Sequence, residues 1–123
     1  MKEKILVIDD EIEICNLLKD FLTREGFVVT IATSAKEGIA LFQTIKPNVV
    51  LLDIKMPDMY GIKVMGKIME LDKSACVIMV TAVMDQKIAQ EALNLGAADY
   101  IIKPFELYQL KNSLLAKLEA LKQ

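Results

Sequence analysis

The sequence predicts an α/β fold: a doubly wound, five-stranded parallel sheet built from (βα)5 units, with strand order 2-1-3-4-5. Five short apolar segments alternate along the chain with five amphipathic segments, which is the pattern of strands joined by helices. The third and fourth apolar segments contain no alternating polar residues, as expected of strands buried on both faces of a parallel sheet. Right-handed crossovers then put helices on both faces, and 2-1-3-4-5 is a common order for such a sheet.

The first strand is expected over residues 4–8, and the helix after it carries apolar residues at intervals of three and four. Asp10 and Glu13 have the spacing of a capping box at the start of this helix, and Gly26 is expected to end it. A second strand follows over residues 27–31. These signals define the first βα unit and the start of the second.

The second helix is predicted to begin at Ser34, because Glu37 stands three residues later, and to end before Pro47. Residues 49–52 are all apolar and form the third strand, which runs directly into Asp53. An acidic residue at the carboxyl end of a central parallel strand lies where open α/β sheets bind their ligands. Asp53 is therefore the first candidate functional residue.

The second half of the chain continues the alternation. After a third helix, residues 76–80 form a fourth buried strand, and Asp85 and Gly96 are expected to cap and to end the fourth helix. Residues 98–102 form a shorter fifth strand, and the last helix carries leucines at intervals of three and four. No repeat or linker interrupts this pattern, so we expect one domain over residues 1–123 with no output domain in this chain.

The composition excludes several classes of protein. Hydrophobic residues make up 54% of the 123 residues, which excludes a disordered chain. A net charge of −2 gives no support for direct nucleic-acid binding, and no apolar run is long enough to span a membrane. Histidine is absent, which excludes histidine-based catalytic triads and zinc sites. Cys15 and Cys76 lie in apolar stretches and are expected to be buried free thiols of a cytoplasmic protein.

Charged and polar residues follow four of the five predicted strands. The first and third strands are neighbours in the predicted order, so Asp9, Asp10 and Asp53 converge on one crevice. Thr81 ends the fourth strand and Lys103 follows the fifth, at the same edge of the sheet. Two unit charges about 4 Å apart repel by roughly 4 kcal/mol at an effective dielectric constant near 20. Some of these carboxylates are therefore expected to take up protons, or a cation lies among them.

Oxygen ligands without histidine or a reactive cysteine favour Mg²⁺ over zinc or copper. Mg²⁺ in proteins usually keeps some water and shares a phosphate oxygen, to which Lys103 and Thr81 can add a positive charge and a hydroxyl donor. The chain has no glycine-rich motif of the kinds that cradle nucleotide phosphates, so the phosphoryl group must come from elsewhere. Asp53 is the reasonable acceptor, because a carboxylate nucleophile can form an acyl phosphate.

The chain closely resembles the response-regulator receiver domains of two-component phosphorelay systems, a family of flavodoxin-like fold that includes the chemotaxis regulators. The resemblance covers essentially the whole chain, and the joint pattern is highly specific although its single pieces are not. The matching residues are the acidic pair Asp9-Asp10, Asp53 within Leu-Leu-Asp-Ile-Lys-Met-Pro, Gly61, Thr81-Ala82, Tyr100 and Lys103-Pro104-Phe105.

This resemblance implies that Asp53 accepts the phosphoryl group and that the protein binds Mg²⁺. Asp10, Asp53 and the backbone carbonyl of Lys55 would ligate the ion directly, and Asp9 would act through water. No other cofactor is implied.

The resemblance further implies that Thr81 and Lys103 bind the phosphoryl oxygens and that the peptide bond before Pro104 is cis. Thr81 and Tyr100 would form a switch. Thr81 moves to the phosphoryl group, the Tyr100 ring turns into the vacated space, and the face formed by the fourth helix, fifth strand and fifth helix changes.

The implied partners are a histidine kinase or phosphotransfer protein, which donates the phosphoryl group, and an unidentified downstream effector. No membrane or nucleic-acid binding is expected, and a dimer that forms on phosphorylation is left open. Such a domain promotes only its own phosphorylation and dephosphorylation, so we do not expect an enzyme. Specificity for the donor is expected on the first helix, at Glu11, Ile12, Cys15, Asn16 and Lys19.

Three other functions fit parts of the pattern. A degenerate receiver would act as a phosphorylation-independent interaction module, but the site residues are intact. A flavodoxin-like binder of FMN would need a phosphate loop where the chain has the acidic run 9–11, which repels phosphate. A Mg²⁺-dependent aspartyl phosphatase would need a second acid shortly after its nucleophile, where the chain has Lys55.

Overall fold

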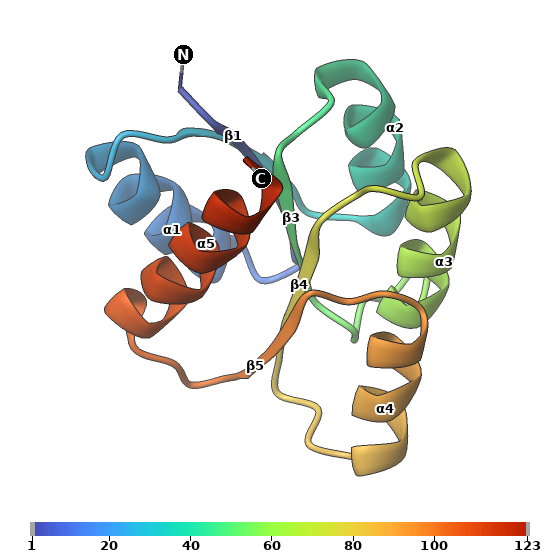
Figure 1. The fold of residues 1–123 in the computed structure, drawn as a ribbon. Helices are drawn as coiled ribbons and strands as arrows, with labels where there is room; N and C mark the ends of the chain where they lie inside the picture. The colour runs from blue at the N-terminus through green and yellow to red at the C-terminus, as the bar shows by residue number, and fades with distance from the viewer. Residues whose placement is uncertain (1, 123) are drawn as a thin grey trace.

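The structure, a computed structural model, describes residues 2–122. Its parallel strands form one sheet in the order β2-β1-β3-β4-β5, which confirms the predicted order (Figure 1). Ile8 of β1 pairs with Ala32 of β2 and with Leu52 of β3, so these three strands end side by side. The strands are β1 (Lys4–Ile8), β2 (Val28–Ala32), β3 (Val49–Leu52), β4 (Val77–Thr81) and β5 (Asp99–Ile102).

Helices cover both faces of the sheet (Figure 1). Helices α1 and α5 contact each other on one face, and α2, α3 and α4 pack in sequence on the other. Within residues 2–122 no helix has the length and apolar character needed to cross a membrane. The helices are α1 (Ile12–Arg24), α2 (Ala35–Ile45), α3 (Gly61–Leu71), α4 (Gln86–Asn94) and α5 (Leu107–Leu121).

The sheet separates two apolar cores, because successive side chains of a strand point to opposite faces. In β1, Ile5 and Val7 belong to the core beneath α1 and α5, whereas Leu6 and Ile8 belong to the core beneath α2 and α3. Every residue of β3 and of β4 is buried, which confirms the expectation that these strands are covered on both faces. The functional residues thus stand at the ends of strands whose positions two cores fix.

Most of the predicted helix signals are present. Ser34 Oγ accepts a hydrogen bond from the backbone N–H of Glu37 at 3.1 Å, and Asp85 Oδ1 accepts one at 2.8 Å from the N–H two residues later. Gly26 and Gly96 follow the ends of α1 and α4 with φ angles of 98° and 109°, a backbone conformation that favours glycine. Local sequence therefore determines where α2 and α4 begin and where α1 and α4 end.

The predicted capping box of Asp10 and Glu13 is wrong. The residue that caps α1 is Glu11, and its side chain makes no capping hydrogen bond. Asp9, two residues earlier, instead accepts a hydrogen bond at its Oδ1 atom from the backbone N–H of Glu11 at 2.9 Å. Asp9 is buried against the first turn of α1, whereas Asp10 is exposed.

Strand and thiol predictions also need small corrections. The second strand starts at Val28 instead of Phe27, because the N–H of Phe27 donates to Leu22 at 3.0 Å and closes α1; β4 and β5 likewise start one residue later than predicted. Cys15 is a buried free thiol as predicted. Cys76 is free but only half-buried, because it stands before β4 instead of within it.

The loop between β3 and α3 is held close to Asp53. The N–H of Gly61 donates to the carbonyl of Ile54 at 2.6 Å, and a Cβ atom at Gly61 would lie 2.2 Å from the backbone oxygen of Asp53. Only glycine fits this approach. The Asp58 carboxylate accepts hydrogen bonds of 3.1 and 3.0 Å from the first two backbone N–H groups of α2, which ties the loop to its neighbour and holds the pKa of Asp58 below its usual value.

Replacement of Gly61 by alanine should lower the free energy of unfolding by about 1–3 kcal/mol, because the added methyl group overlaps the backbone at Asp53. Gly66→Ala in the same helix is the matched control. Nothing lies within 4 Å of a Cβ atom built there, so the better helix former should raise the unfolding free energy by about 0.5–1 kcal/mol. Urea unfolding measures both changes, and equal effects would contradict the close contact at Gly61.

Candidate functional site

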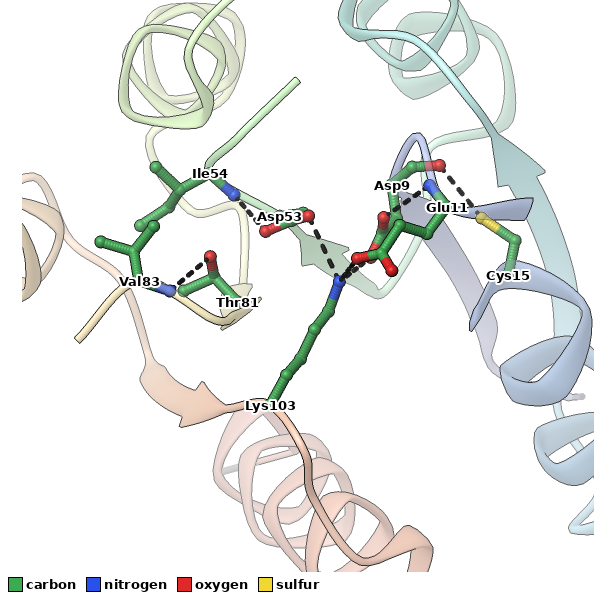
Figure 2. Close-up of polar contacts among 8 residues, drawn as sticks. All are labelled: Asp9, Glu11, Cys15, Asp53, Ile54, Thr81, Val83 and Lys103. Atoms are coloured by element: carbon green, nitrogen blue, oxygen red, sulfur yellow. Dashed lines mark hydrogen bonds and ion pairs between the residues drawn. The ribbon is translucent and has the colours of Figure 1, made fainter. Parts of the chain in front are cut away.

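The residues predicted to converge meet at the carboxyl edge of the sheet, and Figure 2 shows Asp9, Asp53, Thr81 and Lys103 among them. Asp9 and Asp53 directly follow β1 and β3, which are paired neighbours. One carboxylate oxygen from each of Asp9, Asp10 and Asp53 lies within 4.8 Å of the other two. Thr81 ends β4, and Lys103 directly follows β5. The topology brings together residues that are up to 94 positions apart in the sequence.

The Lys103 ammonium group lies at the centre of this cluster (Figure 2). Its Nζ atom is 2.7 Å from Asp9 Oδ2, 2.8 Å from Glu11 Oε1 and 3.3 Å from Asp53 Oδ2. An ammonium group has three N–H donors, so these three carboxylates can use all of them. Glu11 is a site residue that the sequence analysis assigned only to partner specificity. The run of three acids that follows β1 is the signal that could have indicated its role here.

Asp53 is a buried carboxylate whose two oxygens are both hydrogen-bonded. Its Oδ1 atom accepts from the backbone N–H of Ile54 at 2.7 Å, and its Oδ2 atom accepts from Lys103. A buried carboxylate would be costly without such partners. Lys55 stands two residues later in the same loop with its side chain exposed. These two hydrogen bonds hold the Asp53 carboxylate in one orientation at the carboxyl edge of the sheet.

Burial and neighbouring charges shift the ionisation of the cluster. Burial raises the pKa of Asp9 to about 6, although the hydrogen bonds from Lys103 and from the N–H of Glu11 oppose the shift; the charge of Asp53 adds to it. Burial alone would lower the pKa of Lys103, but hydrogen bonds to Asp9 and Glu11 outweigh it and raise that pKa above its ordinary value. Lys103 is therefore a permanent cation in a crowded acidic site.

Thr81 and Tyr100 are connected through one intervening residue. The buried Thr81 Oγ1 atom accepts from the backbone N–H of Val83 at 3.3 Å, and the Tyr100 hydroxyl donates to the carbonyl of Val83 at 2.7 Å. Burial raises the pKa of the Tyr100 hydroxyl, so it stays a donor at neutral pH. The backbone N–H of Lys103 donates to the carbonyl of Thr81 at 2.9 Å, and the Lys103–Pro104 peptide bond is cis, the isomer that the resemblance implies.

The donor set of the acidic cluster fits a hard divalent cation. Asp9, Asp10 and Asp53 supply only oxygen ligands, and the carboxylates of Asp9, Asp53 and Glu11 lie around one ammonium group. Asp10 is exposed, which leaves room for the water ligands that Mg²⁺ retains. The residues present therefore suit Mg²⁺ better than a metal that prefers nitrogen or sulfur ligands.

Comparisons with known proteins agree on one family. The family model for the response regulator receiver domain matches residues 5–115. The chemotaxis protein CheY of Thermotoga maritima is 36% identical over 107 residues, which cover 86% of this chain and 89% of that protein. Sporulation initiation phosphotransferase F of Bacillus subtilis is 32% identical over 114 residues, which cover 93% of this chain and 92% of that protein.

Solved structures and longer relatives add to this result. A CheY-like response regulator receiver domain protein from Methanospirillum hungatei superposes with a TM-score of 0.95 at 35% identity, covering 98% of this chain and 96% of that one. Some relatives are much longer: the matching segment is 23% of the regulatory protein AtoC of Escherichia coli, which is 39% identical over 107 residues.

The raised pKa of Asp9 makes stability depend on pH. The folded chain keeps a proton on Asp9 up to about pH 6, whereas the unfolded chain releases it near 3.8, so this contribution to stability is lost as the pH rises between these values. Asp9→Asn cannot titrate there. We therefore compare the free energies of unfolding of the variant and of the original protein without metal, by urea unfolding. The difference should change in favour of the variant by about 1–3 kcal/mol from pH 4 to pH 7. A difference that does not change with pH would contradict the shift.

Proposed function

The chain belongs to the response-regulator receiver domain family, and from that membership we propose that it accepts a phosphoryl group on Asp53 in a Mg²⁺-dependent reaction. The donor is a histidine kinase or a phosphotransfer protein. One observation carries the proposal: Asp53 is buried at the end of a central strand, 3.3 Å from a lysine ammonium group and beside two further aspartates. Such a carboxylate is oriented for attack and has a cation ready for the charge that arrives.

In this proposal Mg²⁺ is held by Asp10, Asp53 and the backbone carbonyl of Lys55, with Asp9 acting through water. The bound metal supplies positive charge that offsets the charge of the carboxylates and of the incoming phosphoryl oxygens. The acidic cluster supports this assignment, because its oxygens lie within 4.8 Å of one another.

The transfer forms one covalent bond to the protein, at Asp53, and the other residues of the site act by position and charge. An oxygen of Asp53 forms a bond to phosphorus while the phosphorus–nitrogen bond of the donor breaks, and the leaving nitrogen keeps the electron pair. Lys103 donates to the transferred phosphoryl group, and so does the Thr81 hydroxyl. Thr81 ends β4, the neighbour of β3, and Lys103 follows β5 and reaches Asp53 with its Nζ atom at 3.3 Å, which supports these roles.

We further propose that the phosphoryl group acts on the face formed by α4, β5 and α5 through Val83. When the Thr81 hydroxyl turns to donate to a phosphoryl oxygen, it gives up the hydrogen bond from the N–H of Val83. The carbonyl of the same residue holds the Tyr100 hydroxyl. Because the Tyr100 ring is already half-buried and hydrogen-bonded, we infer that the switch works by moving the backbone on both sides of the Val83 Cα atom instead of by a free swing of the ring.

The phosphoryl donor would dock beside α1. A groove of about 400 Å³ lies between α1 and the segment after β5, and Lys103 contributes to its lining. Its other walls are largely apolar, from Ile14, Leu17, Pro104 and Phe105. A helix of the donor could bury apolar side chains here and place its phosphorylated histidine at the neighbouring Asp53.

Exposure refines the expected specificity residues on α1. Glu11, Ile12, Asn16 and Lys19 are exposed and remain part of the proposal. Cys15 is fully buried and its Sγ atom donates to the carbonyl of Asp9 at 3.2 Å, so the expectation that it contributes to partner specificity by contact is wrong.

Intact-mass measurement after incubation with Mg²⁺ and acetyl phosphate tests the proposed function. We expect a single phosphoryl addition that disappears without Mg²⁺ and in Asp53→Asn. Asp20→Asn, an exposed acid on α1 outside the cluster, is the control and should be modified like the original protein. If the original protein gains no phosphoryl group, the proposal fails, and a degenerate receiver that acts by protein contact alone becomes the better interpretation.

The route through Val83 predicts a selective effect of Tyr100→Phe, which removes only the hydroxyl. Phosphorylation should shift backbone amide NMR signals around Asp53 in the variant as in the original protein, but the shifts in α4 and β5 should be clearly smaller. Tyr108→Phe, at an exposed ring of α5, should keep the full response. Undiminished shifts in α4 and β5 of Tyr100→Phe would contradict this route.

A further inference from the structure

We propose that Glu11 is a positioning residue that holds the Lys103 ammonium group in competition with an anion on Asp53, and so sets how tightly the site binds that anion. The inference deepens the proposed function and rests on it. Glu11 carries no role in the phosphoryl chemistry described above.

The distances show which carboxylates hold Lys103 most closely (Figure 2). Its Nζ atom lies 2.7 Å from Asp9 and 2.8 Å from Glu11, but 3.3 Å from Asp53. The residue that is proposed to receive the phosphoryl group thus has the longest of the three contacts. When the Nζ atom moves closer to a group on Asp53, its contact with one of the other two acids lengthens.

Glu11 is the acid that can release Lys103 at the lower cost. Its side chain is 57% exposed, so water can replace the lysine as its partner. Asp9 is only 4% exposed, so bulk water has little access to take the place of the lysine there. Because Glu11 is the more exposed of the two acids, we expect Lys103 to release Glu11 and to keep its contact with Asp9.

The backbone holds Glu11 in place for this contact. Its N–H donates to Asp9 Oδ1 at 2.9 Å, and its carbonyl accepts from the N–H of Cys15 at 3.1 Å in the first turn of α1. Its side chain makes no capping hydrogen bond at the start of that helix. The backbone of Glu11 is thus fixed where its carboxylate accepts a hydrogen bond of 2.8 Å from Lys103.

Two variants and one control separate contact from charge. Glu11→Gln removes the charge, and Glu11→Asp keeps the charge but shortens the side chain by one methylene group, which takes the carboxylate away from Lys103. Glu13→Gln removes an equal charge from an exposed position two residues later on α1. If the contact with Lys103 matters, both Glu11 variants change in the same direction, and Glu13→Gln does not.

Beryllofluoride, an anionic analogue of the phosphoryl group, is the probe, titrated at saturating Mg²⁺ and followed by NMR. We expect Glu11→Gln and Glu11→Asp to bind it about two- to fivefold more tightly than the original protein, the range that follows from releasing a partly exposed ion pair. Glu13→Gln should bind as the original protein does. In metal-free protein, the Lys103 ammonium signal should shift in both Glu11 variants and stay unchanged in Glu13→Gln.

The outcomes distinguish the two proposals. If the original protein does not bind beryllofluoride with Mg²⁺, the proposed function and this inference fail together. If it binds, but the Glu11 variants bind equally or more weakly, the competition is refuted and the proposed function stands. A gain that Glu11→Gln and Glu13→Gln share, and Glu11→Asp lacks, would show an effect of total charge and would likewise overturn the positioning role.

Discussion

The ion pairs of Lys103 are the interaction on which the site depends. Asp9 and Asp53 are buried next to each other, and two like charges at about 4 Å repel by roughly 4 kcal/mol even at an effective dielectric constant near 20. One ammonium group touches both of them and Glu11 as well. Without it, the carboxyl ends of β1 and β3 would bring uncompensated charge into the protein. The same cation is what an arriving phosphoryl group requires, so a single side chain serves the resting site and the proposed reaction.

The order of the strands in the sheet places the side chains of this contact next to one another. Parallel pairing of β1 with β3 puts two acids side by side, and β4 and β5 add a hydroxyl and an ammonium group along the same edge. The two cores keep those strand ends in place, and Gly61 and Asp58 hold the loop that follows Asp53. In the proposed switch, motion falls to the exposed Glu11 side chain and to the backbone at the buried Val83, whose N–H and carbonyl connect Thr81 to Tyr100. The acids are thus held in fixed positions, while the proposed route through Val83 can pass a change at Asp53 to Tyr100.

Sequence reasoning reached the sheet order and the residues at the strand ends, because both follow from the alternation of apolar segments and the rules of parallel sheets. It failed where side chains compete for the same local role. Asp10 and Glu13 have capping-box spacing, yet Asp10 is exposed and the buried Asp9 accepts from the N–H of Glu11. Glu11 looked like a surface residue of α1, and only the position of Lys103, 92 residues away, gives it a second role. The link through Val83 uses backbone atoms, which no side-chain pattern reports.

In the proposed reaction, Lys103 exchanges a carboxylate partner for the phosphoryl group on Asp53 while Mg²⁺ occupies the acidic cluster. A crystal structure of the chain with Mg²⁺ and beryllofluoride tests it most directly. We expect the metal between Asp10, Asp53 and the carbonyl of Lys55, with Lys103 Nζ on a fluorine and no longer on Glu11. A structure in which the anion is bound at Asp53 while Lys103 keeps its contact with Glu11, or in which the metal lies outside the acidic cluster, would contradict it.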